Sequence, residues 1–350
     1  MNFFSFQYIT ITRIKIAIVT SCFTFCVLNL SLNWSSFEHS YNNQDKSMVG
    51  KHSTRSLANT TLIEILTKTQ NELPIILTVV DESNRQFIFN WMCHIQDMQL
   101  DGQLIIITSD DSLKDDIEKN QVLKQQPFYV ISLEKDLRNM NQPIARYNLT
   151  LTKCVSIFVL EILKRNFEVF LFRIESVWLQ NPIGIFHLLK QKDESIDIFS
   201  TGFNKSPSTV DAGFIFVRPT SPAISFWKHY MILINGMLSR YAKLQDQESD
   251  NPCNYFPQLL YRRYARVNYY LVPVRQIQDA CWYVGNGVAI DSVPKGHDKF
   301  AGLYIVRAYS NNVTNQQTLE AYNHWFLDIH GKCQYDRVVK AEQSIWRLRY

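Results

Sequence analysis

Two charged residues stand two positions apart where an apolar run of the sequence ends. Arg173 and Glu175 follow residues 168–172 (EVFLF), which predict a buried strand. In an open α/β sheet, ligands bind beyond the C-terminal ends of the strands. Glu175 offers carboxylate oxygens that suit Mg²⁺ or Mn²⁺, whereas the guanidinium of Arg173 has only donors and cannot ligate a metal. The sequence therefore predicts a candidate site at this strand end.

Predicted strands and helices alternate on both sides of this position. The helix before it is predicted at 149–165, where one side carries Leu151, Val155, Phe158, Val159, Ile162 and Leu163. Further strands are predicted at 74–80, 103–108, 127–133, 196–200 and 213–218, and further helices at 84–99, 182–190 and 222–239. The aspartates at 110, 111, 115 and 116 are interpreted as the solvated start of another helix. This alternation predicts an α/β domain with a mainly parallel central sheet flanked by helices.

The N-terminal region carries a candidate membrane anchor. Residues 16–32 form a 17-residue stretch without a charge, flanked on its N-terminal side by Arg13 and Lys15. A helix of this length rises about 25 Å, which is enough for a thin bilayer, and the positive flank favours a cytosolic N-terminus. A cleaved signal peptide and a buried core segment are the alternatives.

The residues after this stretch are expected to face the lumen of the secretory pathway. Residues 33–70 are rich in Ser, Asn, Thr and Lys and predict a stem, and glycosylation sequons begin at Asn59, Asn148, Asn204 and Asn312. The predicted organisation is a cytosolic tail (1–15), a transmembrane signal anchor (16–32), a luminal stem (33–70), one luminal domain (71–335) and a C-terminal tail (336–350).

The cysteines do not form a metal-binding or redox pattern. Of the seven, two fall in the predicted anchor, and the other five include no CxxC pair. An oxidising lumen predicts one or two disulfides, with Cys253, Cys281 and Cys333 as the better candidates. Cys93 and Cys154 fall on apolar helix faces and are expected to be buried free thiols.

The distribution of charge argues against a nucleic-acid partner. The net charge is +4, from 36 basic and 32 acidic residues. Residues 1–70 hold six of the basic and three of the acidic groups, so residues 71–350 carry 30 basic and 29 acidic groups. A nearly neutral body lacks the concentrated basic surface that binds a phosphate backbone.

The segment 167–182 (FEVFLFRIESVWLQNP) resembles a motif of the nucleotide-diphospho-sugar transferase family, Golgi glycosyltransferases with the GT-A fold. In that family the strand ends in Asp-x-Asp, followed by an apolar pair, Trp-Leu and a proline. This sequence keeps that frame with Ser176, Val177, Trp178, Leu179 and Pro182. Arg173 and Glu175, however, stand where the two acids belong.

Other segments extend the resemblance over about residues 72–330. The helix with Lys153 looks like the family's helix before the motif, and residues 211–220 (DAGFIFVRPT) are similar to its Asn-x-Gly-Phe strand. Asp250, with Asn251, resembles its Asp-Gln segment. Near the end, residues 302–312 (GLYIVRAYSNN) resemble a strand that leads into His-x-Asn, but Arg307 occupies the histidine position.

The resemblance implies a nucleotide-sugar donor, whose transfer leaves a diphosphate that needs positive charge beside it. The family supplies this charge with Mn²⁺ or Mg²⁺, held by Asp-x-Asp and often by the histidine. Arg173 and Arg307 would repel such an ion. Either these two arginines bind the diphosphate directly, or Glu175 alone holds a weak metal site, or the donor site has decayed.

The remaining candidates follow from the same resemblance. Asp211 and Asp250 are the catalytic candidates, able to orient the acceptor or to act as a base, and surface or capping roles are the alternative. Lys153 is a candidate for the donor phosphate, and a solvated helix lysine is the alternative.

The sequence thus predicts a single-pass type II Golgi membrane protein with a luminal GT-A-like domain. Its expected activity is transfer of a hexose or pentose from a nucleotide-diphosphate donor to the hydroxyl of a glycan or glycoprotein. The alternative is a catalytically inactive luminal protein that binds glycans or serves as a scaffold.

Overall fold

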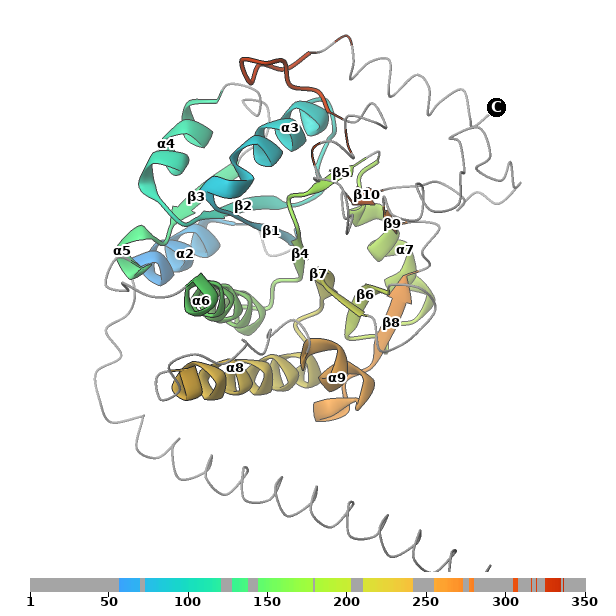
Figure 1. The fold of residues 1–350 in the computed structure, drawn as a ribbon. Helices are drawn as coiled ribbons and strands as arrows, with labels where there is room; N and C mark the ends of the chain where they lie inside the picture. The colour runs from blue at the N-terminus through green and yellow to red at the C-terminus, as the bar shows by residue number, and fades with distance from the viewer. Residues whose placement is uncertain are drawn as a thin grey trace, which may run out of the picture. The chain divides into compact units, whose positions relative to one another are not determined.

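The fold is known from a computed structural model, which describes residues 57–69, 73–120, 128–137, 144–178, 180–202, 210–241, 255–272, 277–279, 305–307, 316, 319, 325–334 and 336 (Figure 1). The chain divides into two compact units, Met1–Arg55 and Ser56–Tyr350, and all the described residues lie in the second. The predicted anchor at 16–32 lies outside the described residues. Within them, no helix has the length and apolar character needed to cross a membrane.

The second unit is built on a seven-stranded sheet with the strand order β3-β2-β1-β4-β7-β6-β8. The strands are β1 (Ile75–Val80), β2 (Gln103–Thr108), β3 (Phe128–Ser132), β4 (Val169–Phe172), β6 (Ile198–Gly202), β7 (Val210–Val217) and β8 (Tyr269–Val272). Neighbouring strands run parallel, except that β7 is antiparallel to both β4 and β6. The predicted α/β domain with a mainly parallel sheet is confirmed.

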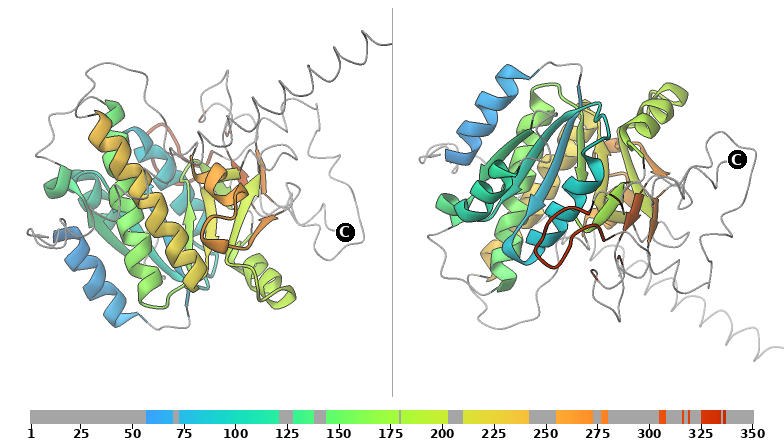
Figure 2. Two further views of the ribbon diagram at one scale, coloured as in Figure 1. Left: turned by 90° about the horizontal axis from the view of Figure 1, so that it is seen from below. Right: turned by 90° about the horizontal axis from the view of Figure 1, so that it is seen from above.

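Helices cover both faces of this sheet, which is why β1 and β2 are continuous apolar runs. On one face, Ile75 and Leu77 pack in a core with α2 (Leu57–Lys68), α6 (Ile144–Lys164), α8 (Ser221–Tyr241) and α9 (Tyr255–Tyr261). On the other face, Ile76 and Val80 pack with α3 (Arg85–Ile95), α4 (Asp111–Lys119) and α7 (Ile183–Lys192). Seen from below, α6 and α8 lie side by side in front of the sheet (Figure 2). Shorter helices are η1 (Glu82–Asn84), α5 (Glu134–Leu137) and η4 (Tyr264–Arg266).

A second, three-stranded sheet has the order β5-β10-β9, with β5 (Ser176–Trp178), β9 (Ile277–Asp279) and β10 (Ile305–Arg307). The strand β10 is antiparallel to β5 and parallel to β9. The sequence predicts a strand around 302–312, but it does not predict β5 or β9, which are three residues long. This small sheet is important for the site because β5 begins directly after Glu175.

The structure corrects the expected extent of the stem. Helix α2 (Leu57–Lys68) lies within the segment 33–70, yet Leu62 and Leu66 are buried in the core beside the sheet. The last part of that segment is therefore a packed helix, because its apolar residues find a partner face on the domain.

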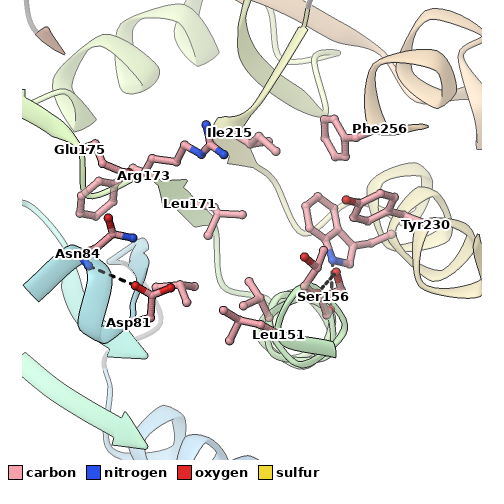
Figure 3. A pocket seen from close by; sticks show the side chains of 15 residues that line it. Asp81, Asn84, Leu151, Ser156, Leu171, Arg173, Glu175, Ile215, Tyr230 and Phe256 are labelled. Atoms are coloured by element: carbon pink, nitrogen blue, oxygen red, sulfur yellow. Dashed lines mark hydrogen bonds between the residues drawn. The ribbon is translucent and has the colours of Figure 1, made fainter. Parts of the chain in front are cut away.

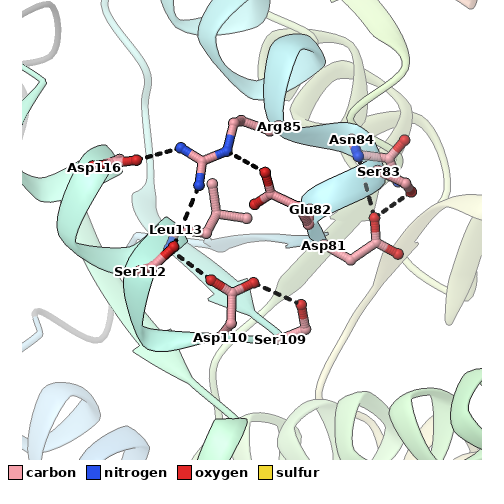
Figure 4. Close-up of polar contacts among 10 residues, drawn as sticks. All are labelled: Asp81, Glu82, Ser83, Asn84, Arg85, Ser109, Asp110, Ser112, Leu113 and Asp116. Carbon is pink, nitrogen blue, oxygen red and sulfur yellow. Dashed lines mark hydrogen bonds and ion pairs between the residues drawn. The ribbon is translucent and has the colours of Figure 1, made fainter.

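The interpretation of the acidic residues after β2 as the start of a helix is confirmed. The Asp110 carboxylate caps α4 by accepting a hydrogen bond from the Leu113 amide at 2.7 Å. Asp116 pairs with Arg85, which also contacts Glu82 through its Nε atom at 2.7 Å (Figure 4). These two carboxylates, Glu82 first, raise the pKa of Arg85, so that side chain stays charged.

The expectation that Cys93 is a free thiol is wrong. Cys93 on α3 forms a disulfide with Cys333, 240 residues later, with 5.7 Å between the Cα atoms. Cys93 does lie on a buried helix face, but burial alone does not distinguish a thiol from a disulfide. Cys154 is a half-buried free thiol as expected, Cys333 is confirmed as a disulfide residue, and Cys253 and Cys281 lie outside the described residues.

The disulfide fastens the C-terminal segment 325–334 to one face of α3. The Asn90 side-chain oxygen accepts a hydrogen bond from the Phe326 amide at 2.6 Å, and the His94 ring stacks on Phe326 with 5.0 Å between the ring centroids. Val177 of β5 is buried in the same cluster. The segment therefore packs against both α3 and the small sheet.

Candidate functional site

A cavity of about 250 Å³ opens where β1 and β4 end. Asp81, just after β1, lines it together with Arg173 and Glu175, which follow β4. Helices α6, α8 and α9 complete its wall through residues such as Leu151, Trp227 and Phe256 (Figure 3). The cavity therefore lies where the sequence places its candidate site, beyond the end of the strand at 168–172.

Both strand ends lie at the same level because their register is fixed. β1 and β4 pair in parallel with Thr78 opposite Phe172, and the buried Thr78 hydroxyl donates to the Phe172 carbonyl at 3.0 Å. The residues that leave each strand, Asp81 and Arg173, are therefore delivered to one edge of the sheet, as expected for parallel neighbours.

Asp81 is a site residue that the sequence reading did not identify. Its carboxylate accepts hydrogen bonds from the Ser83 hydroxyl at 2.5 Å and from the Asn84 amide at 3.2 Å, and thereby caps η1. The signal was present in the sequence, since an aspartate directly after a buried strand and three residues before a helix fits both a cap and a strand-end site.

Arg173 and Glu175 lie on a turn that is held by a hydrogen bond from the next residue, Ser176. The Ser176 hydroxyl, itself buried, donates to the Arg173 carbonyl at 2.8 Å, and Ile174 is buried between the two charged residues. Arg173 is exposed and Glu175 is half-buried. In Figure 3 the Arg173 side chain starts near Glu175 and extends so that its guanidinium points toward Ile215.

The small sheet brings the backbone of Arg307 to this turn. In the antiparallel pair of β10 and β5, Arg307 stands opposite Ser176. Paired residues in such a ladder have Cα atoms about 4.5–5.5 Å apart. Arg307 is therefore close in space to the turn that carries Arg173, although its side chain lies outside the described part of the structure.

The three remaining predicted site residues, Lys153, Asp211 and Asp250, are not among the described residues that line the cavity. Lys153 lies on α6 between cavity-lining neighbours, but it is not one of the residues that line the cavity. Asp211 is the second residue of β7 and lies three residues before Phe214, which pairs with Phe172. Its backbone therefore lies beyond the end of β4, at the edge of the sheet where the cavity opens. Asp250 lies outside the described residues.

The described lining of the cavity presents two carboxylates, Asp81 and Glu175, to the divalent cation that the resemblance implies. Asp81 accepts both of these hydrogen bonds through its Oδ1 atom, and Glu175 shares the mouth with the positively charged Arg173. Mg²⁺ requires near-octahedral coordination by oxygen ligands, and several of these ligands are usually water molecules. Across the described ranges, no cluster of three or more His, Cys, Asp or Glu side chains is arranged to hold a metal.

Residues 100–256 match the sequence model of the nucleotide-diphospho-sugar transferase family. The match runs from just before β2 to the start of α9 and contains Arg173, Glu175, Asp211 and Asp250. The resemblance inferred from residues 167–182 and 211–220 is therefore confirmed, and this part of the chain is similar to nucleotide-sugar transferases.

A curated relative is the "Beta-arabinofuranosyltransferase RAY1" of Arabidopsis thaliana, 23% identical over 158 residues. That alignment covers 43% of this chain and 28% of the relative, so the chain spans under a third of the protein it matches.

Among solved structures, the glycosyltransferase GlyE of Streptococcus pneumoniae TIGR4 is similar at a TM-score of 0.46 and 10% identity, over 78% of this chain and 64% of that one. Mouse xyloside xylosyltransferase 1 is similar at a TM-score of 0.43 and 9% identity, over 69% of this chain and 99% of that one.

Proposed function

We propose that this protein is a GT-A-like glycosyltransferase that moves a sugar from a nucleotide-diphosphate donor to the hydroxyl of a glycan or protein. The observation that carries the proposal is the cavity at the ends of β1 and β4, with Arg173 and Glu175 on its lining, inside the segment that matches the transferase family. A largely parallel sheet with its cavity at the carboxyl edge is consistent with this chemistry.

In this proposal the donor diphosphate is held by guanidinium groups. Arg173 is exposed at the mouth, and the backbone of Arg307 lies across from Ser176 in the small sheet. A guanidinium can present two parallel N–H donors to a phosphate, and its charge does not titrate in the physiological range. These groups would take the place of the cation on the leaving diphosphate.

The reaction then requires one bond exchange. The acceptor oxygen bonds to the anomeric carbon as the bond between that carbon and the diphosphate oxygen breaks. The electron pair of the broken bond leaves on the diphosphate, where the arginines stabilise it, and the acceptor proton passes to a base. Asp211 and Asp250 are the proposed candidates for that base or for orienting the acceptor, and Lys153 is a further proposed donor contact.

We also place the protein in the Golgi membrane as a single-pass type II protein. The charge-free stretch at 16–32 and its positive flank support this topology. The disulfide between Cys93 and Cys333 is consistent with an oxidising compartment for the domain.

Isothermal titration of the full chain with UDP and with GDP, in Mn²⁺ and in EDTA, tests the proposed donor site. Binding that persists in EDTA supports recognition by the arginines. Binding only in Mn²⁺ would instead indicate a metal site at Glu175. No binding of either nucleotide under any condition would contradict the proposal and support a glycan-binding or scaffold protein.

A further inference from the structure

The C-terminal segment 325–334 covers the strand that follows residues 173–175, which we call the donor turn. Val177 of β5 is buried, and the apolar cluster around it includes Cys93 of α3 and residues 325–327 of the segment. Seen from above, the red segment lies beside α3 (Figure 2). The proposed donor chemistry gives this segment no role.

The helix α3 holds the donor turn from its other side. Trp91 of α3 contacts Phe172, which precedes the turn, and Trp178, which follows it, with ring centroids 5.1 Å apart in each pair. Phe172 and Trp178 also meet edge-to-face at 4.7 Å. Because successive residues of a strand point to opposite faces, Trp178 packs with Trp91 while Val177 joins the cluster of the segment. The position of the turn therefore depends on both α3 and the segment.

The place of the segment depends in turn on its disulfide. The segment is a small hairpin, in which Leu327 pairs with Cys333 in a β-bridge and the Gln334 amide donates to the Phe326 carbonyl at 2.7 Å. A two-stranded hairpin of this size is marginally stable by itself. The bond from Cys333 to Cys93 spans 240 residues of sequence, so its loss would greatly enlarge the space open to the segment.

The disulfide can be reached by a dithiol on the side of Cys333. Cys93 is buried, whereas Cys333 is half-buried and follows an exposed turn in which Ile329 is 95% exposed. Attack of one thiolate on the Cys333 Sγ atom breaks the S–S bond, and the electron pair leaves on the Cys93 Sγ atom, which takes a proton. The second thiol of the reagent then releases Cys333 as a thiol. The protein gains two electrons and two protons, and the dithiol becomes a disulfide.

We infer that segment 325–334 positions the donor turn through Val177, and that reduction of the bond between Cys93 and Cys333 weakens donor binding by releasing the segment. The inference rests on the proposed function, because it takes the donor turn as part of the donor site. The three named side chains are positioning residues, since they act on the turn through β5 and are not among the residues that line the cavity.

Hydrogen–deuterium exchange of the full chain without nucleotide, before and after treatment with dithiothreitol, tests the link between the segment and the turn. Reduction should speed exchange at 325–334 and at 173–178, and should leave the central strand β2 unchanged. Faster exchange at 325–334 with unchanged exchange at 173–178 would overturn the inference. This measurement needs no donor, so its failure is distinguishable from a failure of the donor site, which appears as absent UDP binding to the oxidised protein.

Titration with UDP measures the consequence for the site. Reduction should weaken UDP binding to the wild type by about 2- to 30-fold. The double variant Cys93→Ala, Cys333→Ala lacks the bond, so dithiothreitol should not change its affinity. A response of the double variant equal to that of the wild type would overturn the inference, because another disulfide would then carry the effect.

Val177→Ala keeps the disulfide but removes part of the contact through which the segment acts. The oxidised variant should bind UDP about 2- to 30-fold more weakly than the wild type, and reduction should weaken its binding less than it weakens that of the wild type. Because the first comparison needs no reductant, it holds even if the reduced protein unfolds.

Val217→Ala is the matched control. Val217 is equally buried, but it pairs with Val169 at the start of β4, whereas the donor turn follows the end of that strand. This variant should bind UDP as the wild type does and should keep the wild-type response to reduction. An equal loss of affinity in the two valine variants would overturn the inference, because it would indicate general destabilisation of the core.

Discussion

Arg307 stands directly opposite Ser176 in the antiparallel pair of β10 and β5. Ser176 in turn holds the turn that carries Arg173, through the bond from its hydroxyl to the Arg173 carbonyl at 2.8 Å. The two arginines that the resemblance places at metal-ligand positions are thus connected through one buried serine. A shared diphosphate ligand would account for the same replacement at both positions.

Ser176→Ala should weaken nucleotide binding without unfolding the domain. Loss of one hydrogen bond should lower the free energy of unfolding by about 0.5–1.5 kcal/mol and should reduce UDP affinity by about three- to tenfold as the turn loosens. Urea denaturation and calorimetric titration measure the two effects. The control is Ser239→Ala, which removes an exposed hydroxyl bond of 2.9 Å to the Asn235 carbonyl on α8. An equal loss of affinity in both variants would contradict a positioning role for Ser176.

Cys333→Ser should destabilise the domain by releasing segment 325–334 from α3. Removal of a disulfide that closes so long a loop costs about 2–5 kcal/mol. Thermal unfolding should show a lower Tm for the variant, and also for the wild type in dithiothreitol. Cys154→Ser, which removes a thiol outside the disulfide, is the control. A wild-type Tm that does not respond to the reductant would argue against the bond between Cys93 and Cys333.

Cys154 should react slowly with alkylating reagents in the folded protein at pH 8. Burial raises the pKa of its thiol to about 11, whereas the pKa of an unfolded cysteine is about 8.5. The folded state therefore holds this proton more tightly, and the associated stability is complete below the unfolded pKa and is lost as the pH rises through the folded value. Mass spectrometry of iodoacetamide-labelled peptides against pH measures the rate at this residue. Labelling at pH 8 as fast as in urea would contradict the raised pKa of this thiol.

The central strands could be predicted because their sequences report burial directly. β1 and β2 are covered on both faces, so IILTVV and QLIIIT are nearly uninterrupted apolar runs. Helix α2 was missed because its apolar run at 62–66 (LIEIL) is short and follows a long polar segment, and Leu62 and Leu66 become core residues only against the finished sheet. β5 and β9 are too short for any periodicity, since each spans three residues.

Some residues of the site could be found from local sequence, whereas others join it only through contacts between distant segments. Arg173 and Glu175 were found because they directly follow a predicted strand. Asp81 joins them only through the pairing of β1 with β4, and the partner of Cys93 lies 240 residues away in sequence. Contacts of this kind depend on tertiary packing, which no local pattern encodes.

The most direct test of the central claim is UDP binding in EDTA to the double variant Arg173→Ala, Arg307→Ala. Loss of one charge-assisted hydrogen bond costs about 1.5–3 kcal/mol, so removal of both guanidinium groups should weaken binding by more than about 100-fold. Arg262→Ala, at an exposed arginine that does not line the cavity, should bind UDP as the wild type does. UDP affinity that is unchanged in the double variant would contradict diphosphate recognition by these two arginines.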